Sequence, residues 1–177
     1  MVRRLTPLAP LAAFAAILVA TPALASLPVG AKAPDFSAVG AIGGGDFNFT
    51  LKKELKKGPV VLYFYPKAFT KGCTLETKAF ADAHDRFARA GATVIGMSAD
   101  DLPSLQRFSK EACRDKFAVA IASPQTIAAY DVSLKKADGS ATGVTSRTSY
   151  VIGKDRKVKM VHSDMDYRDH VKMTLAA

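Results

Sequence analysis

The stretch Val-Val-Leu-Tyr-Phe-Tyr-Pro at residues 60–66 is a continuous run of aliphatic and aromatic residues that ends at a proline. A short run without a polar position is typical of a central strand covered on both faces of its sheet. After residues 67–72, apolar residues recur at three- and four-residue steps from 73 to 90, and Gly91 follows. This spacing predicts a helix over 73–90. Cys73 is therefore expected in the first turn of a helix that follows a buried strand.

The other segments continue this alternation of strands and helices. A glycine turn at 43–45 separates two short extended pieces. Further expected elements are helices over 51–57, 103–112, 124–130 and 167–175, strands over 93–98 and 117–122, and a hairpin of 148–152 with 157–162. This order predicts an α/β domain with a central mixed β-sheet flanked by helices.

Residues 1–25 have the features of a secretory signal peptide. Arg3 and Arg4 precede an apolar stretch over 8–20, and the small residues before Ser26 form an A-x-A cleavage site. We expect cleavage after Ala25, a periplasmic or secreted location, and a single domain over 26–177. An uncleaved membrane anchor is the alternative, although the apolar stretch is shorter than a spanning helix needs.

The chain is basic but its charge is scattered. Loss of the two arginines of the signal peptide lowers the formal net charge from +9 to +7. The lysines and arginines lack the interleaved aromatic residues that nucleic-acid binding favours, so we interpret them as a solvated surface.

The two cysteines, Cys73 and Cys113, are 40 residues apart, and the chain is long enough to form a core without a disulfide. There is no C-x-x-C pair, glycine-rich phosphate loop or Ser-His-Asp pattern. The three histidines, His84, His162 and His170, lack neighbours at metal-ligand spacing, and we interpret them as structural or surface residues. No metal or cofactor is expected.

Cys73 stands out chemically because of its predicted place at the start of a helix. Unpaired backbone N–H groups and the positive end of the helix dipole favour a thiolate there.

At this point the chain resembles a known family. Pro66-x-x-x-Thr70-x-x-Cys73 matches the active-site motif of the peroxiredoxins, and the residues around it resemble the bacterioferritin comigratory protein, or peroxiredoxin Q, branch. Arg147, which precedes a predicted strand, and the Ala-Pro-Asp-Phe sequence at 33–36 fit the same pattern. The resemblance extends from about residue 29 to the end and implies a thioredoxin-like fold.

The resemblance implies a thiol-specific peroxidase that depends on a thioredoxin-type reductant. Cys73 would be the peroxidatic cysteine, which peroxide oxidises to a sulfenic acid. Thr70 would hydrogen-bond to peroxide and thiolate, Arg147 would stabilise the thiolate and the leaving oxygen, Pro66 would shield the site from water, and Glu76 would orient the arginine. The alternatives are a buried structural thiol at Cys73, a helix cap at Thr70, a surface arginine at Arg147 and a helix-dipole role for Glu76.

The second thiol of the reaction is less well specified. Many relatives carry a resolving cysteine five residues after the peroxidatic one, where this chain has Lys78. Cys113 is the internal candidate, and some members of the branch carry their resolving cysteine on the corresponding helix. A disulfide needs α-carbons within about 7 Å of each other. Because Cys73 is predicted in the first turn of a helix, that turn would have to unwind for Cys73 to reach Cys113. The alternative is a one-cysteine enzyme reduced directly by an external thiol.

The expected partners are a hydroperoxide, hydrogen peroxide or an organic one, and an external thiol or dithiol such as a thioredoxin-like protein. We expect a monomer that has no nucleic-acid partner and no stable membrane association after signal cleavage. Two other functions remain open at this stage: a peroxide-sensing thiol module without efficient turnover, and a scaffold whose cysteines form a structural disulfide.

Overall fold

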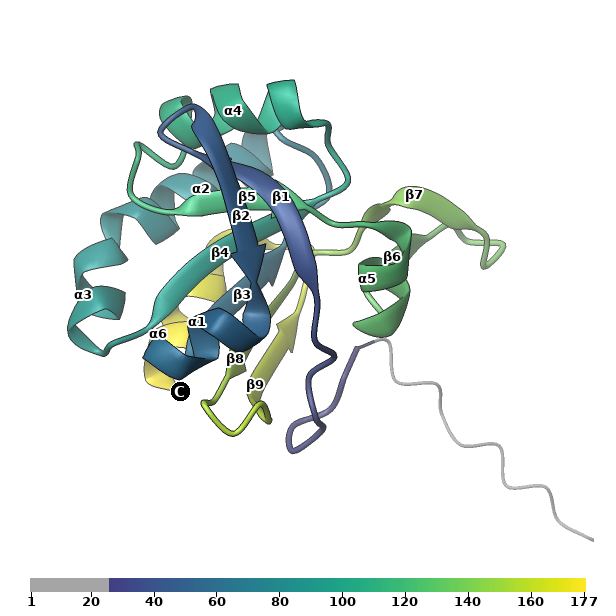
Figure 1. Cartoon of the computed structure of the whole chain (residues 1–177). Helices are drawn as coiled ribbons and strands as arrows, with labels where there is room; N and C mark the ends of the chain where they lie inside the picture. The colour runs from purple at the N-terminus through teal and green to yellow at the C-terminus, as the bar shows by residue number, and fades with distance from the viewer. Residues whose placement is uncertain (1–25) are drawn as a thin grey trace, which may run out of the picture.

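The computed structural model describes residues 26–177, and the predicted signal peptide, 1–25, lies outside the described residues (Figure 1). The strands are β1 (Ser37–Ile42), β2 (Gly45–Thr50), β3 (Val60–Phe64), β4 (Thr93–Ser98), β5 (Ala118–Ile121), β6 (Ser133–Lys135), β7 (Ala141–Thr145), β8 (Thr148–Ile152) and β9 (Val158–Ser163). The helices are α1 (Leu51–Lys57), α2 (Lys71–Asp82), α3 (His84–Arg89), α4 (Leu102–Glu111), α5 (Pro124–Ala129), the short 3₁₀ helix η1 (Tyr167–Asp169) and α6 (His170–Ala176). Within 26–177, no helix combines the length and hydropathy of a membrane span.

The core of the fold is a seven-stranded mixed sheet in the order β2-β1-β5-β4-β3-β8-β9. β3, β4 and β5 are parallel to one another, whereas β8 runs antiparallel to β3 and pairs Thr148 with Phe64. The carboxyl ends of the three parallel strands and the amino end of β8 therefore lie at the same edge of the sheet. β6 and β7 form a separate hairpin that extends away from the sheet in Figure 1.

The apolar run at 60–66 divides between two cores, one on each face of the sheet. Val61, Tyr63 and Tyr65 pack into a core with residues of α2, α3, α4 and α6. Val60, Leu62 and Phe64 alternate to the other face, where the core includes residues of α1 and α5. The strand is therefore buried on both faces, as the sequence predicts, because helices cover both sides of the sheet.

The mixed α/β class and most predicted elements are confirmed, but the predicted helix over 73–90 is wrong in two respects. The helical segment begins earlier, at Lys71, and it divides into α2 and α3 at Ala83. No glycine or proline marks this division. Across it, Phe80 of α2 and Phe87 of α3 stack with a centroid distance of 5.9 Å, so the two helices pack against each other. His84 consequently begins α3 instead of lying in the middle of a helix.

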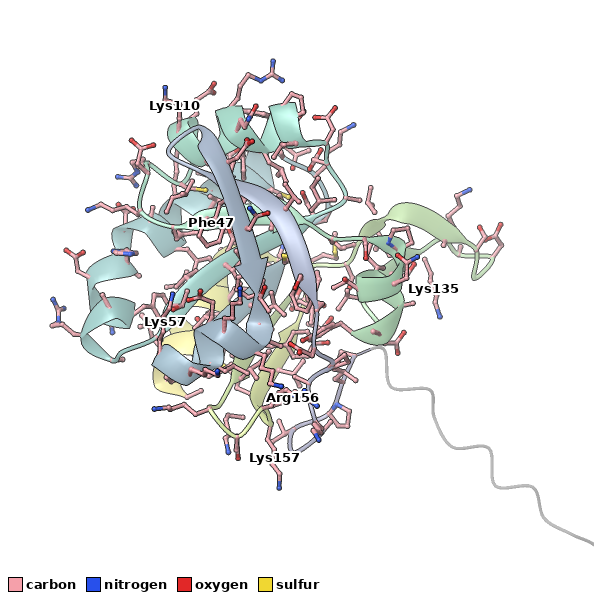
Figure 2. All side chains as sticks on the ribbon, viewed as in Figure 1. Phe47, Lys57, Lys110, Lys135, Arg156 and Lys157 are labelled. Atoms are coloured by element: carbon pink, nitrogen blue, oxygen red, sulfur yellow. The ribbon has the colours of Figure 1, made fainter. Side chains whose placement is uncertain are left out.

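The β6–β7 hairpin was not expected from the sequence. β6 has three residues and neither strand has a clear apolar alternation, so the signal for a half-buried strand is missing. Lys52, Lys56, Lys154 and Arg156 line one surface depression, so part of the basic charge is gathered there rather than scattered. Figure 2 labels basic side chains on several parts of the fold. They are Lys57, Lys110, Lys135, Arg156 and Lys157.

Candidate active site

Segments that are distant in the sequence meet at the sheet edge described above. The loop after β3 leads into α2, which carries Cys73 in its first turn, and Arg147 stands directly before β8. β9 pairs Ser163 with Thr148 at this same edge, so the connection from β9 to η1 and α6 also lies there. The topology of the sheet therefore places Arg147 and the C-terminal segment beside the start of α2.

Cys73 is the third residue of α2, and its side chain is buried. The first turn of the helix is closed by Thr74 N–H, which donates to the Thr70 carbonyl at 2.9 Å. The N–H groups of this turn and the helix dipole favour a negative charge on a side chain here. The cysteine lies in the first helical turn, as predicted.

Arg147 joins the sulfur to the other groups of the site. Its Nη2 donates to Cys73 Sγ at 3.4 Å, its Nε donates to the Met165 carbonyl at 3.0 Å, and its Nη1 pairs with Glu76 Oε2. The side chain is 5% exposed, so the alternative of a surface arginine is wrong. Burial opposes the charged guanidinium, but Glu76 and Cys73 raise the pKa of Arg147 above its ordinary value. The site therefore holds a permanent cation against the sulfur.

Glu76 lies one helical turn after Cys73, on the same side of α2. Its side chain is fully buried. Burial raises the pKa of Glu76 to about 8, although Arg147 acts in the opposite direction. Its second oxygen, Oε1, is buried without a hydrogen-bond partner among the described residues.

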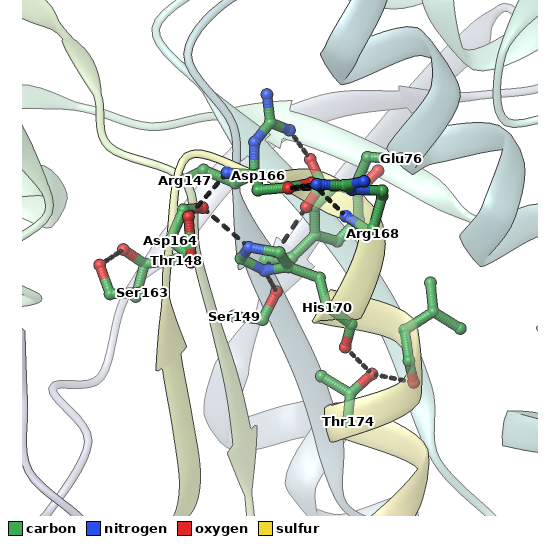
Figure 3. A network of polar contacts seen from close by, with 12 residues as sticks. Glu76, Arg147, Thr148, Ser149, Ser163, Asp164, Asp166, Arg168, His170 and Thr174 are labelled. Atoms are coloured by element: carbon green, nitrogen blue, oxygen red, sulfur yellow. Dashed lines mark hydrogen bonds and ion pairs between the residues drawn. The ribbon is translucent and has the colours of Figure 1, made fainter.

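His170 is the member of the site that the sequence analysis missed (Figure 3). It begins α6, is fully buried, and has its Nδ1 at 3.6 Å from Glu76 Oε1. The ring also contacts Ser149 Oγ at 2.8 Å and the Asp164 carbonyl at 2.9 Å. Burial lowers the pKa of His170 to about 4. The sequence offered no signal for this contact because 94 residues separate His170 from Glu76.

The loop before α2 is fixed by hydrogen bonds from both sides. Asp100, just after β4, accepts from Ala68 N–H at 2.7 Å and from Ser98 Oγ at 2.8 Å. Thr145 Oγ1 donates to the Tyr65 carbonyl at 2.7 Å. Asp100 was also missed, although its place after a strand parallel to β3 could have indicated it.

Thr70 and Pro66 lie in this loop, where the motif expects them. Thr70 is the N-cap residue of α2, but its side chain makes no capping hydrogen bond and instead donates to the Lys67 carbonyl at 2.9 Å. Its hydroxyl is exposed and keeps lone pairs that can accept another hydrogen bond. Pro66 is half-buried between β3 and the loop.

Gly72 allows the close approach of Arg147 to the helix start. A Cβ at this position would meet Arg147 Nη2 at 3.2 Å. Beside it, a shallow depression of about 430 Å³ is lined by Lys71, Gly72 and Leu75 together with residues of the η1 segment.

Cys113 follows α4 in the same core as Cys73 and is fully buried. Both cysteines are free thiols. Burial raises the pKa of Cys113 well above its ordinary value, so this thiol is protonated in the folded state. Within 26–177, no group of three His, Cys, Asp or Glu side chains could hold a metal ion.

This chain is similar to known proteins. Residues 29–161 match the model of the AhpC/TSA family. The chain is 34% identical over 153 residues to peroxiredoxin Bcp of Bacillus subtilis, an alignment that covers 85% of this chain and 94% of the relative.

Two solved structures are also similar. Peroxidoxin BcpB of Mycobacterium tuberculosis superposes with a TM-score of 0.72 at 33% identity, covering 84% of this chain and 94% of that one. The bacterioferritin comigratory protein of Xanthomonas campestris, whose structure was described for its alkyl peroxide reduction activity, gives a TM-score of 0.68 at 26% identity, covering 78% and 87%. The fold is thus that of the thioredoxin-like peroxiredoxins, and the family implies a peroxide substrate and a thiol reductant. The chain belongs to the AhpC/TSA family and is a thiol-dependent peroxidase of the Bcp/peroxiredoxin Q type.

Proposed function

We propose that Cys73 is the peroxidatic cysteine and that it reduces both hydrogen peroxide and organic hydroperoxides. The contact of Arg147 Nη2 with Cys73 Sγ, at the start of a helix, carries this proposal. A cation and a helix N-terminus both stabilise a thiolate relative to a thiol, and the thiolate is the nucleophile. The alkyl peroxide reduction described for the Xanthomonas campestris relative supports the wider substrate range.

The chemical step is a displacement on oxygen. The thiolate sulfur of Cys73 attacks one peroxide oxygen, an S–O bond forms, and the O–O bond breaks with its electron pair on the leaving oxygen. That oxygen takes a proton and departs as water or an alcohol, while Cys73 becomes a sulfenic acid. Arg147 stabilises the charge that develops on the leaving oxygen.

Three further residues support this step. Thr70 hydrogen-bonds to the bound peroxide through its exposed hydroxyl. Pro66 limits the access of water and, because it has no N–H, offers no competing donor. Glu76 holds Arg147 through Nη1, which leaves Nη2 directed at the sulfur.

We propose that Cys113 resolves the sulfenic acid. Its thiol would attack the oxidised Cys73, release water and form a disulfide that an external dithiol then reduces. Cys73 is held in the first turn of α2 by the Thr74–Thr70 hydrogen bond, and Cys113 is buried beyond α4. We expect the first turn of α2 to unwind so that the two sulfurs can meet.

Oxidation of wild-type protein by one equivalent of peroxide tests this resolution. We expect an internal Cys73–Cys113 disulfide in the mass spectrum, whereas Cys113→Ser accumulates a sulfenic acid that dimedone traps at Cys73. Turnover with a dithiol reductant that is unchanged in Cys113→Ser would instead indicate a one-cysteine enzyme. Oxidation without any turnover in either protein would favour a peroxide sensor.

We also propose that residues 1–25 direct export and that the mature chain, from Ser26, acts as a periplasmic or secreted monomer without a stable membrane association. In that compartment the reductant is a thioredoxin-like dithiol protein rather than cytosolic thioredoxin. Fractionation of producing cells, N-terminal mass analysis and light scattering of the mature protein test these points. A chain that keeps its first 25 residues in the cytosol would contradict them.

A further inference from the structure

A surface depression of about 390 Å³ gathers basic side chains from two elements that are distant in the sequence. One side is formed by α1 and the other by the turn between β8 and β9 (Figure 1). The residues that line this basic depression are Lys52, Leu55, Lys56, Lys154, Asp155 and Arg156. The two elements meet because α1 leads into β3 at Val60, which pairs with Ile152 at the end of β8. The basic depression therefore lies at the opposite edge of the sheet from Cys73, which follows the other end of β3.

The four cations of the basic depression have no ion-pair partner among residues 26–177. Asp155, the one carboxylate that lines it, accepts from Lys159 Nζ at 2.7 Å through Oδ2 and from Lys157 N–H at 3.1 Å through Oδ1. Lys52 and Lys56 stand four residues apart on one helix, a spacing at which like charges repel each other. The basic depression is therefore a concentration of uncompensated positive charge.

Two further carboxylates lie on or beside α1, and both have other partners. Glu54 pairs with Lys57 Nζ at 2.9 Å, and Asp35 accepts from the backbone N–H of Lys52 at 3.1 Å. Neither forms an ion pair with a lysine of the basic depression. The protein itself thus leaves these cations available to an external anion.

Arg156 adds a hydrogen-bond donor that has no acceptor. Its backbone is fixed in the turn, where its N–H donates to the Gly153 carbonyl at 2.8 Å and its carbonyl accepts from Ala33 N–H at 2.8 Å. The side chain, labelled in Figure 2, is half-buried, and its Nε is buried without a hydrogen-bond partner among the described residues. A buried donor without an acceptor is unfavourable and uncommon in folded proteins. A small rotation of this long side chain would present Nε to an acceptor in the basic depression.

We propose that the basic depression binds a small anion with more than one phosphoryl group, for which inorganic pyrophosphate is the simplest probe. Phosphoryl oxygens accept charge-assisted hydrogen bonds from lysine and arginine, and a planar guanidinium can donate to two of them at once. A single carboxylate would neutralise only one of the four cations, whereas an anion of this class carries several negative charges. The volume is within the range of small-molecule sites. This site is separate from the peroxidase site and does not depend on the proposed function.

Titration of the protein with sodium pyrophosphate at constant ionic strength, followed by calorimetry and NMR, tests the proposal. We expect saturable binding and chemical-shift changes in α1 and the β8–β9 turn, with none at Cys73. Lys52→Gln/Lys56→Gln should weaken the binding by about tenfold or more, because it removes two donors to charged oxygens. Glutamine is a good helix former, so α1 is preserved. Lys53→Gln/Lys135→Gln is the matched control, since it removes the same charge from two exposed lysines outside the basic depression.

Absence of saturable binding to the wild-type protein at millimolar pyrophosphate would overturn the proposal. Equal weakening in the two double variants would also overturn it, because it would indicate a general attraction between unlike charges. Vesicles of phosphatidylglycerol test the other source of phosphoryl groups. Protein that sediments with these vesicles and does not bind pyrophosphate would have a lipid-binding surface in place of a site for a free anion. None of these measurements involves peroxide, so they can fail separately from the proposed function.

Discussion

Arg147 makes three directed contacts at once, with a sulfur, a carboxyl group and a carbonyl. The planar guanidinium can do this because its donors point in fixed directions, whereas the single ammonium of a lysine cannot reach all three acceptors. A positive charge at position 147 is therefore not sufficient to make the three contacts, which also need the fixed donor directions of the guanidinium.

We predict that Arg147→Lys lowers the rate constant for peroxide reduction by about 10²-fold, the usual effect of removing one donor to a developing charge. Arg114→Lys is the matched control, because Arg114 forms an exposed ion pair with Asp82. Stopped-flow peroxide consumption compares the two variants. Equal rates would show that the geometry of the guanidinium does not matter.

Sequence alone could predict part of this set of residues. Cys73, Thr70 and Pro66 share one short motif, and Glu76 lies one turn further on the same helix. Asp100 could have been indicated by its place just after the predicted strand at 93–98. His170 could not be assigned from its neighbours in the chain, because its contacts depend on the docking of α6, which no local pattern encodes.

At the level of secondary-structure elements, residues at the carboxyl end of β4 fix the loop that precedes α2 through hydrogen bonds. Asp100 receives the Ala68 N–H and the Ser98 hydroxyl, and Phe69 between this point and the helix has a positive φ of 63°. Such a backbone conformation is unfavourable for a phenylalanine and persists only when its surroundings hold it. Asp100 therefore helps to keep the loop in its active shape.

We predict that Asp100→Ala destabilises the fold by about 1–3 kcal/mol, because it leaves the Ala68 N–H without its partner. Hydrogen exchange at Ala68 should accelerate and the peroxide rate constant should fall. Asp101→Ala is the control, since Asp101 caps α4 through Ser104 N–H and does not contact the loop. It should reduce stability while the Ala68 exchange and the peroxide rate stay at wild-type values. Loss of rate in both variants would indicate a general effect of instability.

The elements themselves were predicted best where a short apolar run or one amphipathic stretch corresponded to a single element. β3, β4 and α4 lie within one or two residues of their expected positions. The sequence carries no glycine or proline at the Ala83 break and no clear apolar alternation in the β6–β7 hairpin, so no local pattern marks either of them.

At the scale of the whole molecule, the buried Glu76–His170 pair links stability to pH. The folded pKa of Glu76 is about 8 against an ordinary value of 4.5, and that of His170 is about 4 against 6.5. Between pH 4.5 and 6.5 the folded and unfolded states each hold one proton on this pair, so its contribution is constant. Between pH 6.5 and 8 only the folded state holds the proton, so its contribution to stability falls as pH rises.

We predict that Glu76→Gln removes this loss of stability at alkaline pH. Measured by denaturant unfolding, the wild-type free energy should fall relative to that of the variant between pH 6.5 and 8, by up to about 1.4 kcal/mol per pH unit. A constant difference between the two proteins over this range would mean that Glu76 is already ionised at pH 6.5 in the folded state.

The central claim is that the thiol of Cys73 reacts directly with peroxide, and single-turnover kinetics test it most directly. Reduced mature protein and its Cys73→Ser variant are mixed with one equivalent of hydrogen peroxide in a stopped-flow instrument. The account predicts rapid consumption of the peroxide by the wild type and none above background by the variant. Slow consumption at the same rate in both proteins would contradict it.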